Sequence, residues 1–523
     1  MGNIAILDCT LRDGGYVNDF VFGEKVIRGF LSKIVKTGIE YCEVGFIKKG
    51  AKDDPDVNVY PGTEAINRII QPKDPNMKYV GMVDMSSPVP LDMITPYDGT
   101  GIDVIRVIFK KSKIQDGYHY CEEIMKKGYT VFAQFVGTDS YSDKEFIEAI
   151  ELFNGLEPYG VAIVDSFGLI TRKQFLRLVY LADNNLKPNI CLAYHAHNNL
   201  QQAMGNAEAL LDLNLKRDIL IDACVFGMGR GAGNLNLELF AEYMNEVYGT
   251  DYKIEPMLEI MDEYLEDVYK DKFWGYSLPM YLSASNGCHP NYSIYLQNKH
   301  ALTVKSFSEI LKNIPDDKKP QFSKENAEFF YQQYLDNHID DSKAIESLKG
   351  ELDGKDVLVM APGSSLRTSS DVVEKYISEK KPVIISVNFD SKDYPIDYIF
   401  SSNMKRFTSI QGETDRKCII TSNMREATKY EYMVNFASYQ GNNSDIIDNA
   451  GVMILKLLAS LGLKKVAIAG MDGYSEQDSV NYFDKKLEYD FQAKESRNAL
   501  ISQEIKELSD KMKCEFITPT VYS

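Results

Sequence analysis

Between residue 1 and about residue 285, short apolar runs alternate with longer amphipathic segments. Segments such as residues 23–38 and 171–185 repeat apolar positions every three to four residues, which is typical of helices that cover a sheet. Eight strand–helix units of this kind close into a barrel of ~250 residues. We therefore predict an α/β fold whose N-terminal domain, residues 1–285, is a TIM (β/α)8 barrel. The eight strand-like runs are IAILDCT, YCEVGF, KYVGMVD, DVIRVIF, TVFAQFV, GVAIVDS, ICLAYHAH and LIDACVFG.

The pattern changes after the barrel. Residues 286–350 contain two helix-like stretches, LTVKSFSEILKNI and KENAEFFYQQYLDNH, separated by the breaker-rich PDDKKPQ, which indicates a helical connector. Residues 351–523 return to strand–helix alternation, with the runs DVLVMA, PVIISVN, YIFSS, KCIITS and KKVAIAG and a helix within residues 448–462. We expect a Rossmann-like α/β domain there, and the sequence leaves its strand order open.

Composition and charge exclude several kinds of partner. The chain has 523 residues, 58 Lys and Arg against 76 Asp and Glu, and a net charge of -18. Binding to nucleic acid or to an anionic membrane needs a concentrated basic surface instead. The N-terminus resembles no signal peptide, and the eight cysteines include no C-x-x-C pair, which favours reduced thiols. We expect a cytoplasmic protein that binds neither nucleic acid nor membrane.

His195 and His197 lie two residues apart on the seventh predicted strand, so both side chains point to the same face. Asp13 follows the first strand, and a barrel brings the carboxyl ends of its strands around one mouth, where the reacting groups of such enzymes lie. Two imidazoles and a carboxylate are a common ligand set for a divalent cation. The alternative is a hydrogen-bonded histidine pair near a loop. We favour the metal site.

The motifs LDCTLRDGG, CEVG, VDSFG, YHAHNNL and GMGRGAGN, in this order, resemble those of the metallo-lyase barrel superfamily. It includes 4-hydroxy-2-oxovalerate aldolases, hydroxymethylglutaryl-CoA lyase, isopropylmalate and homocitrate synthases, and pyruvate carboxyltransferases. The resemblance spans about residues 4 to 290. It implies that Asp13, His195 and His197 bind Mn2+ or Mg2+, with Zn2+ or Co2+ as alternatives. It also implies that Asn234 lies close to the metal or on it.

A cation at this position would act as a Lewis acid on the enolate of a 2-oxo acid such as pyruvate. Arg12 can donate hydrogen bonds to the same oxygen as it becomes anionic. Glu43 would then fix Arg12, and the alternative is a solvated carboxylate at a strand end. The other polar residues at the strand ends are candidates for substrate binding, namely Arg106, Gln134, Ser166 and Arg230.

Two features depart from the subfamilies that this chain resembles. The aldolases place a histidine two residues after the glycine of R-D-G, where this chain has Tyr16, and the acetyl-CoA-using synthases read R-D-G-E-Q. Tyr16 can replace the missing base only if its pKa falls well below ~10. His289, in NGCHPNY, is a second candidate if that segment folds over the mouth; otherwise it is a loop histidine. The glycine-rich run at 227–233 is better interpreted as a tight turn near the metal than as a phosphate site.

The C-terminal domain opens with APGSSL, where a strand meets a Gly/Ser turn whose backbone N–H groups suit a phosphate. With SVNFD, FSSN and AGMDGY, it weakly resembles the nucleotide-binding fold of bacterial sialyltransferases and pterin pyrophosphokinase-like proteins. The resemblance implies a nucleotide or nucleotide-sugar site; the alternative is an assembly domain. All six histidines precede this domain, so nucleotide binding fits better than glycosyl transfer. The residues implied are Gly363, Ser364, Ser365, Asn388 and Asn403.

The features together predict a homo-oligomeric lyase or aldolase that joins or splits a 2-oxo acid and an aldehyde at a divalent metal. The fused domain would suit sugar or surface-polysaccharide biosynthesis. One alternative is an acyl-CoA condensing synthase, which the missing E-Q pair disfavours. Another is a barrel kept only for binding or assembly, which the intact set of Asp13, His195 and His197 disfavours.

Overall fold

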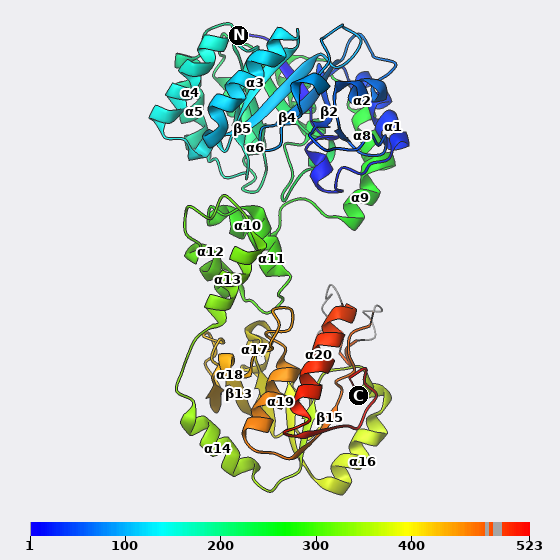
Figure 1. The fold of residues 1–523 in the computed structure, drawn as a ribbon, viewed down its shortest axis with the longest axis vertical. Helices are drawn as coiled ribbons and strands as arrows, with labels where there is room; N and C mark the ends of the chain where they lie inside the picture. Colours follow the sequence, from blue (N-terminus) through cyan, green and yellow to red (C-terminus); the bar gives the residue numbers. More distant parts are fainter. Residues whose placement is uncertain (1, 476–480, 485–493, 523) are drawn as a thin grey trace. The chain divides into compact units, whose positions relative to one another are not determined.

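The computed structural model describes residues 2–475, 481–484 and 494–522. The chain forms two compact units, Met1–Pro290 and Asn291–Ser523. Each has its own parallel sheet covered by helices, so the expectation of an α/β fold is confirmed for both (Figure 1). No helix among the described residues is long and apolar enough to cross a membrane.

The first unit is a closed barrel. β1 pairs in parallel with both β2 and β9, so the sheet has no free edge among its eight main strands, as predicted. A further two-residue strand, β3, pairs with the end of β2. The strands are β1 Ile4–Asp8, β2 Tyr41–Ile47, β3 Val59–Tyr60, β4 Lys78–Asp84, β5 Val104–Lys110, β6 Thr130–Val136, β7 Gly160–Asp165, β8 Cys191–Ala196 and β9 Ile219–Ala223.

Apolar periodicity explains how helices cover this barrel. In α3 the buried positions include Tyr120, Cys121 and Ile124, one helical stripe, while the charged residues face outward. Strand residues alternate: Ile6 packs toward the helices and Leu7 fills the interior of the barrel. α3, α4 and α5 lie outside the strands in Figure 1. The helices of this unit are α1 Glu24–Ile34, α2 Thr63–Ile69, α3 Ile114–Lys126, α4 Asp143–Leu156, α5 Arg172–Asn185, α6 Ala203–Asp212, α7 Leu237–Tyr248, α8 Glu255–Ile260, α9 Glu266–Asp271 and α10 Leu278–Ser285.

The second unit begins with helices and continues as a seven-stranded parallel sheet in the order β14-β13-β12-β11-β10-β15-β16. The chain winds outward from β10 to β14 and then returns to β15 on the other side of β10. The strand order therefore reverses between β10 and β15, a topological switch point of the kind at which open α/β sheets bind ligands. The strands are β10 Val357–Met360, β11 Val383–Val387, β12 Tyr398–Ser401, β13 Lys417–Thr421, β14 Tyr432–Val434, β15 Lys465–Ala469 and β16 Lys513–Phe516.

Helices pack against this sheet, and α19 contacts both β11 and β12. α19 and α20 lie side by side on one face (Figure 1), and α19 is apolar on nearly all sides because it packs into the core. The helices are α11 Pro290–Gln297, α12 Val304–Asn313, α13 Lys324–Leu335, α14 Ser342–Leu352, α15 Ser365–Thr368, α16 Ser370–Lys380, α17 Met404–Ile410, α18 Phe436–Tyr439, α19 Ala450–Ser460 and α20 Lys494–Leu508.

Candidate functional site

Arg12 and Asp13 reach the barrel mouth because the first strand ends early. β1 stops at Asp8, and the N–H of Asp13 donates to the carbonyl of Cys9 over 2.7 Å, so the chain makes a helical turn instead of continuing the pleat. Neighbouring side chains on a helical turn are not forced to opposite faces, as they would be on a strand. Both side chains are buried, and the guanidinium of Arg12 donates to the carboxylate of Asp13.

The predicted metal ligands lie together at the carboxyl ends of β1 and β8. His195 Nε2 lies 3.4 Å from Asp13 Oδ2, and His197 Nε2 lies 3.8 Å from Asp13 Oδ1. One ligand atom from each of the three residues falls within 4.8 Å of the others. The imidazole rings of His195 and His197 lie nearly edge to face, with their centres 5.4 Å apart. Each ring directs its Nε2 toward the Asp13 carboxylate. The structure therefore brings the three predicted ligands into one buried cluster.

Asn234 lies beside this cluster because a glycine-rich turn brings it there. Asn234 Nδ2 donates to Asp13 Oδ1 over 3.1 Å, and its backbone forms a β-bridge with His197. Gly233 has a φ of 79°, and a Cβ at this position would lie 2.1 Å from the carbonyl oxygen of Gly227. Only glycine fits such a close approach at positive φ.

Asp222, near the carboxyl end of β9, orients His195. Its Oδ2 lies 2.8 Å from His195 Nδ1 and accepts from Arg106 Nη2 over 2.5 Å. A carboxylate at Nδ1 orients the ring so that Nε2 points toward Asp13, as in carboxylate–histidine–metal arrangements. The sequence analysis did not single out Asp222, although a charged residue inside an apolar strand is a signal that it has a partner.

Arg12 and Arg106 form a buried ion-pair network through Glu43. Glu43 Oε2 accepts from Arg12 Nε over 2.6 Å and from Arg106 Nη1 over 3.4 Å. Arg106 Nη2 also donates to Gln134 Oε1 over 2.9 Å. Since Arg106 is fully buried, it lies behind Asp222 and His195 and supports them. Arg12 is nearer the mouth, and among the described residues its Nη2 has no acceptor.

Two of the three candidate ligands, Asp13 and His197, have the protonation states that bind a metal ion. Burial alone would raise the pKa of Asp13, but Arg12 and the two histidines lower it well below its usual value, so the carboxylate is ionised. Burial lowers the pKa of His197 to about 4, helped by His195, Arg230 and Arg12, so this imidazole is neutral. A neutral imidazole and an ionised carboxylate are the protonation states that bind metal ions. Burial would lower the pKa of His195, but its hydrogen bonds to Asp13 and Asp222 raise it well above its usual value, so this ring holds a proton that a metal ion would displace.

These residues fit a divalent cation. His197 Nδ1 and Asn234 Oδ1 are buried without a hydrogen-bond partner among the described residues, and such atoms usually have a partner such as water or an ion. Asn234 Nδ2 donates to Asp13 and to the carbonyl oxygen of Met228, which fixes the amide and leaves Oδ1 as the atom available to a cation. Two nitrogens and a carboxylate suit Mn2+, Mg2+ or Zn2+ with further positions open for substrate.

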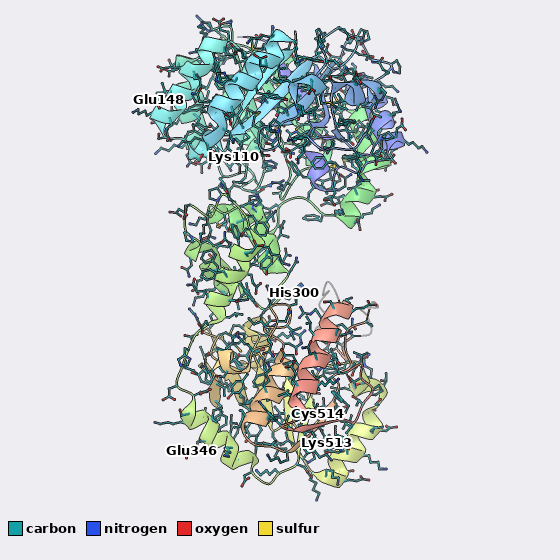
Figure 2. All side chains as sticks on the ribbon, viewed as in Figure 1. Lys110, Glu148, His300, Glu346, Lys513 and Cys514 are labelled. Carbon is teal, nitrogen blue, oxygen red and sulfur yellow. The ribbon has the colours of Figure 1, made fainter. Side chains whose placement is uncertain are left out.

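Tyr16, Arg230 and His289 lie around the mouth. The Arg230 guanidinium carbon is 4.0 Å from the centre of the Tyr16 ring. Burial raises the pKa of Tyr16 although Arg230 opposes the shift, so its phenol stays protonated. His289 packs 5.0 Å from the ring of Phe167, which follows β7. Burial, with Arg230 and Lys110 (Figure 2) nearby, lowers the pKa of His289 to about 4.

Ser166 and the contact between Cys9 and Cys224 also belong to this end of the barrel. Ser166 Oγ, at the end of β7, accepts the N–H of Gly137 over 3.0 Å, so it holds the neighbouring strand end. Cys9 Sγ lies 3.3 Å from Cys224 Sγ, and both thiols are buried next to the candidate ligands. The substrate contacts predicted for Arg106, Gln134, Ser166 and Arg230 stay predictions.

In the second unit, the APGSSL loop is closed by an acidic residue far along the chain. Asp472 accepts the N–H of Ser365 over 2.7 Å and the hydroxyls of Ser364 and Ser365. A Cβ on Gly363 would lie 2.3 Å from the carbonyl oxygen of Gly470. The backbone N–H of Ser365, one of the donors that we expected to bind a phosphate, therefore already has a protein partner.

The two predicted asparagines lie at the ends of neighbouring strands. Asn388, after β11, has a φ of 59° and accepts the Ser401 hydroxyl over 2.7 Å. Asn403, after β12, caps α17 by accepting the N–H of Arg406 over 3.1 Å. Their nucleotide contacts stay predictions.

Comparison with known proteins finds relatives of the first unit. Residues 3–262 match the family model described as HMGL-like. A 4-hydroxy-2-oxovalerate aldolase from Serratia proteamaculans (strain 568) is 24% identical over 262 residues, which are 50% of this chain and 77% of the relative. An oxaloacetate decarboxylase from Mycobacterium tuberculosis (strain ATCC 25618 / H37Rv) is 23% identical over 236 residues, 45% of this chain and 67% of the relative. The solved HMG-CoA lyase from Brucella melitensis is 15% identical and covers 52% of this chain and 100% of its own, with a TM-score of 0.42.

Proposed function

We propose that the HMGL-like domain formed by residues 3–262 is a divalent-metal-dependent carbon–carbon lyase that acts on a 2-oxo acid. The observation that carries the proposal is the buried cluster of Asp13, His195 and His197. The relatives support it: 4-hydroxy-2-oxovalerate and oxaloacetate, the compounds in two of their names, are both 2-oxo acids. In both compounds, breaking the bond beyond the third carbon leaves the enolate of pyruvate.

Asp13, His195 and His197 would hold the metal, which would polarise the 2-keto group and stabilise negative charge on its oxygen. Arg12 can add to this effect through Nη2, because Glu43 and Asp13 already fix the other side of its guanidinium. A donor held in place before the reaction needs no reorganisation as charge develops, which is why such donors contribute strongly to rate.

Proton transfer in the aldolase direction needs two steps. A base takes the proton of the 4-hydroxyl group as the bond between C3 and C4 breaks and the aldehyde leaves, and an acid then protonates C3. His289 suits the first step because its low pKa keeps it neutral and able to accept a proton. Tyr16 suits the second because its raised pKa keeps the phenol protonated. We propose these roles for the pair; the proton on His289 then returns through solvent water to the Tyr16 phenolate, which restores both groups for the next turnover.

The test uses purified full-length protein with Mn2+, a panel of 4-hydroxy-2-oxo acids of different chain length, and oxaloacetate. Proton NMR would follow the release of the 2-oxo acid and the aldehyde. We expect metal-dependent cleavage of at least one compound, and none in Asp13→Ala. Cleavage that is equally fast in Asp13→Ala and in excess chelator would overturn the proposal.

The same panel, repeated with acetyl-CoA added, separates the rival functions. An acyl-CoA condensing synthase would release free thiol from acetyl-CoA in the presence of a 2-oxo acid, and a barrel used only for assembly would turn over none of these compounds. We favour the lyase because the mouth holds proton-transfer candidates and an anion donor around one buried ligand cluster. We further propose that the aldehyde partner and the fused second unit belong to sugar or surface-polysaccharide biosynthesis.

A further inference from the structure

The second unit has a cavity at the carboxyl ends of its central strands. It opens between the ends of β10, β11 and β15, next to the switch point, and a second, smaller cavity adjoins it. Their volumes are about 120 Å³ and 80 Å³. Both are lined by Asn388, Arg406, Asn449, Tyr474 and Tyr482. The lyase proposed for the barrel uses none of these residues.

Positive charge gathers on one wall of this cavity. Arg406 lies on the first turn of α17, where Asn403 caps the helix. The adjoining cavity adds the charge of Arg497, and the ring of His300, which is labelled in Figure 2, also lines it. The first turn of the eleven-residue helix α19, Ala450 and Gly451, forms another part of the wall, and its backbone dipole adds to the positive potential.

The acidic residues on the same walls are already paired within the protein. Asp472 accepts the donors of Ser364 and Ser365, and Asp448 Oδ2 accepts the Tyr331 hydroxyl over 3.1 Å. Because Asp472 already accepts the donors of the APGSSL loop, an anion in this cavity belongs beside Arg406 and not in that loop.

Aromatic rings form the remaining wall. The guanidinium carbon of Arg406 lies 5.2 Å from the centre of the Tyr482 ring, and that of Arg497 lies 5.8 Å from Tyr474. Tyr522 completes the lining. Rings beside a cationic group suit a ligand that carries both a flat ring and a negative charge, because the ring packs on the tyrosines while the charge meets the arginine.

We propose that this cavity binds a nucleoside phosphate, with the phosphate at Arg406 and the first turn of α19 and the base against the tyrosines. The site gives the second unit a ligand of its own. This position differs from the one expected from the sequence, because the proposed phosphate lies at Arg406 and α19 and not in the turn after β10. Asn388 and Asn403 still line the cavities.

Calorimetry on the full-length protein tests the proposal. The four common nucleoside monophosphates, the matching nucleosides and inorganic phosphate would each be titrated. We expect at least one monophosphate to bind about tenfold or more tightly than its nucleoside and than phosphate alone, because both halves of the ligand find partners. Failure of every monophosphate to bind would overturn the proposal, as would equal binding of inorganic phosphate.

Matched variants locate the site. Arg406→Gln should weaken the monophosphate about tenfold or more, since a charge-assisted contact is lost. Arg416→Gln removes the same charge just before β13, at a residue that lines neither cavity, and should leave affinity unchanged. Tyr482→Ser should weaken the monophosphate and spare inorganic phosphate, and thermal melts would check that each variant folds. Equal effects of Arg406→Gln and Arg416→Gln would contradict the proposed location. Cleavage by the barrel, measured in the same samples, tests the lyase separately.

Discussion

Asp222→Asn tests whether the contact between Asp222 and His195 orients His195 for metal binding. The amide keeps the volume of the side chain but removes the charge that faces His195 Nδ1 and Arg106 Nη2 over 2.8 and 2.5 Å. His195 then loses the partner that orients its ring. Loss of such a supporting carboxylate typically costs 10–100-fold in metal affinity, or about 1.4–2.7 kcal/mol.

The same change should lower stability, because it leaves Arg106 buried with one carboxylate fewer. Breaking a buried pair from one side costs about 3–5 kcal/mol, and we expect the lower end because Glu43 and Gln134 still bind Arg106. Urea unfolding in excess chelator would measure this loss, and calorimetry with Mn2+ would measure the affinity.

Asp103→Asn is the matched control. Asp103 is also a buried carboxylate in an ion pair, with Lys73 Nζ at 2.7 Å, but it precedes β5 and lies at the amino end of the barrel. We expect it to lower stability and to leave Mn2+ affinity intact. If Asp222→Asn binds Mn2+ within twofold of the unmodified protein, or if Asp103→Asn loses as much affinity, the inferred role of Asp222 is wrong.

Three further predictions concern the mouth. Arg12→Lys should keep Mn2+ affinity and lower turnover about a hundredfold, because the planar donor is lost while the charge stays; unchanged turnover would limit Arg12 to a structural role. Because the pKa of His289 is lowered to about 4, its basic form persists as pH falls below the usual ~6.5 of histidine. The acid limb of kcat/KM should therefore lie near 4 and disappear in His289→Phe, and a limb near 6.5 would assign the base elsewhere. Gly233→Ala should weaken Mn2+ binding, since its Cβ would lie 2.1 Å from the Gly227 carbonyl oxygen; calorimetry showing full affinity would refute this account of the turn.

The barrel was predictable from the sequence because each strand and helix has its own apolar pattern, and eight repeats specify one closed architecture. The ligands Asp13, His195 and His197 were predictable for a similar reason, since strand ends of a barrel converge. What the sequence could not supply is which interior groups meet. Asp222 reaches His195 across two neighbouring strands, and that contact depends on the barrel's register.

The second unit shows the same limit more strongly. β14 and β16 were missed because both are short edge strands, and KCEF carries charges that obscure its pattern. The Gly/Ser turn after β10 was recognised, but its occupant was not. Asp472 lies 107 residues from Ser365 in sequence, so no local pattern could reveal that a carboxylate closes that turn.

The most direct test of the central claim is metal-dependent exchange of the protons on C3 of a 2-oxo acid in deuterium oxide. Proton NMR would follow pyruvate and its longer homologues with the unmodified protein and with His195→Ala/His197→Ala. We expect exchange that requires Mn2+ or Mg2+, stops in excess chelator and is lost in the double variant. Exchange that persists in the double variant at the rate of the unmodified protein would contradict the central claim.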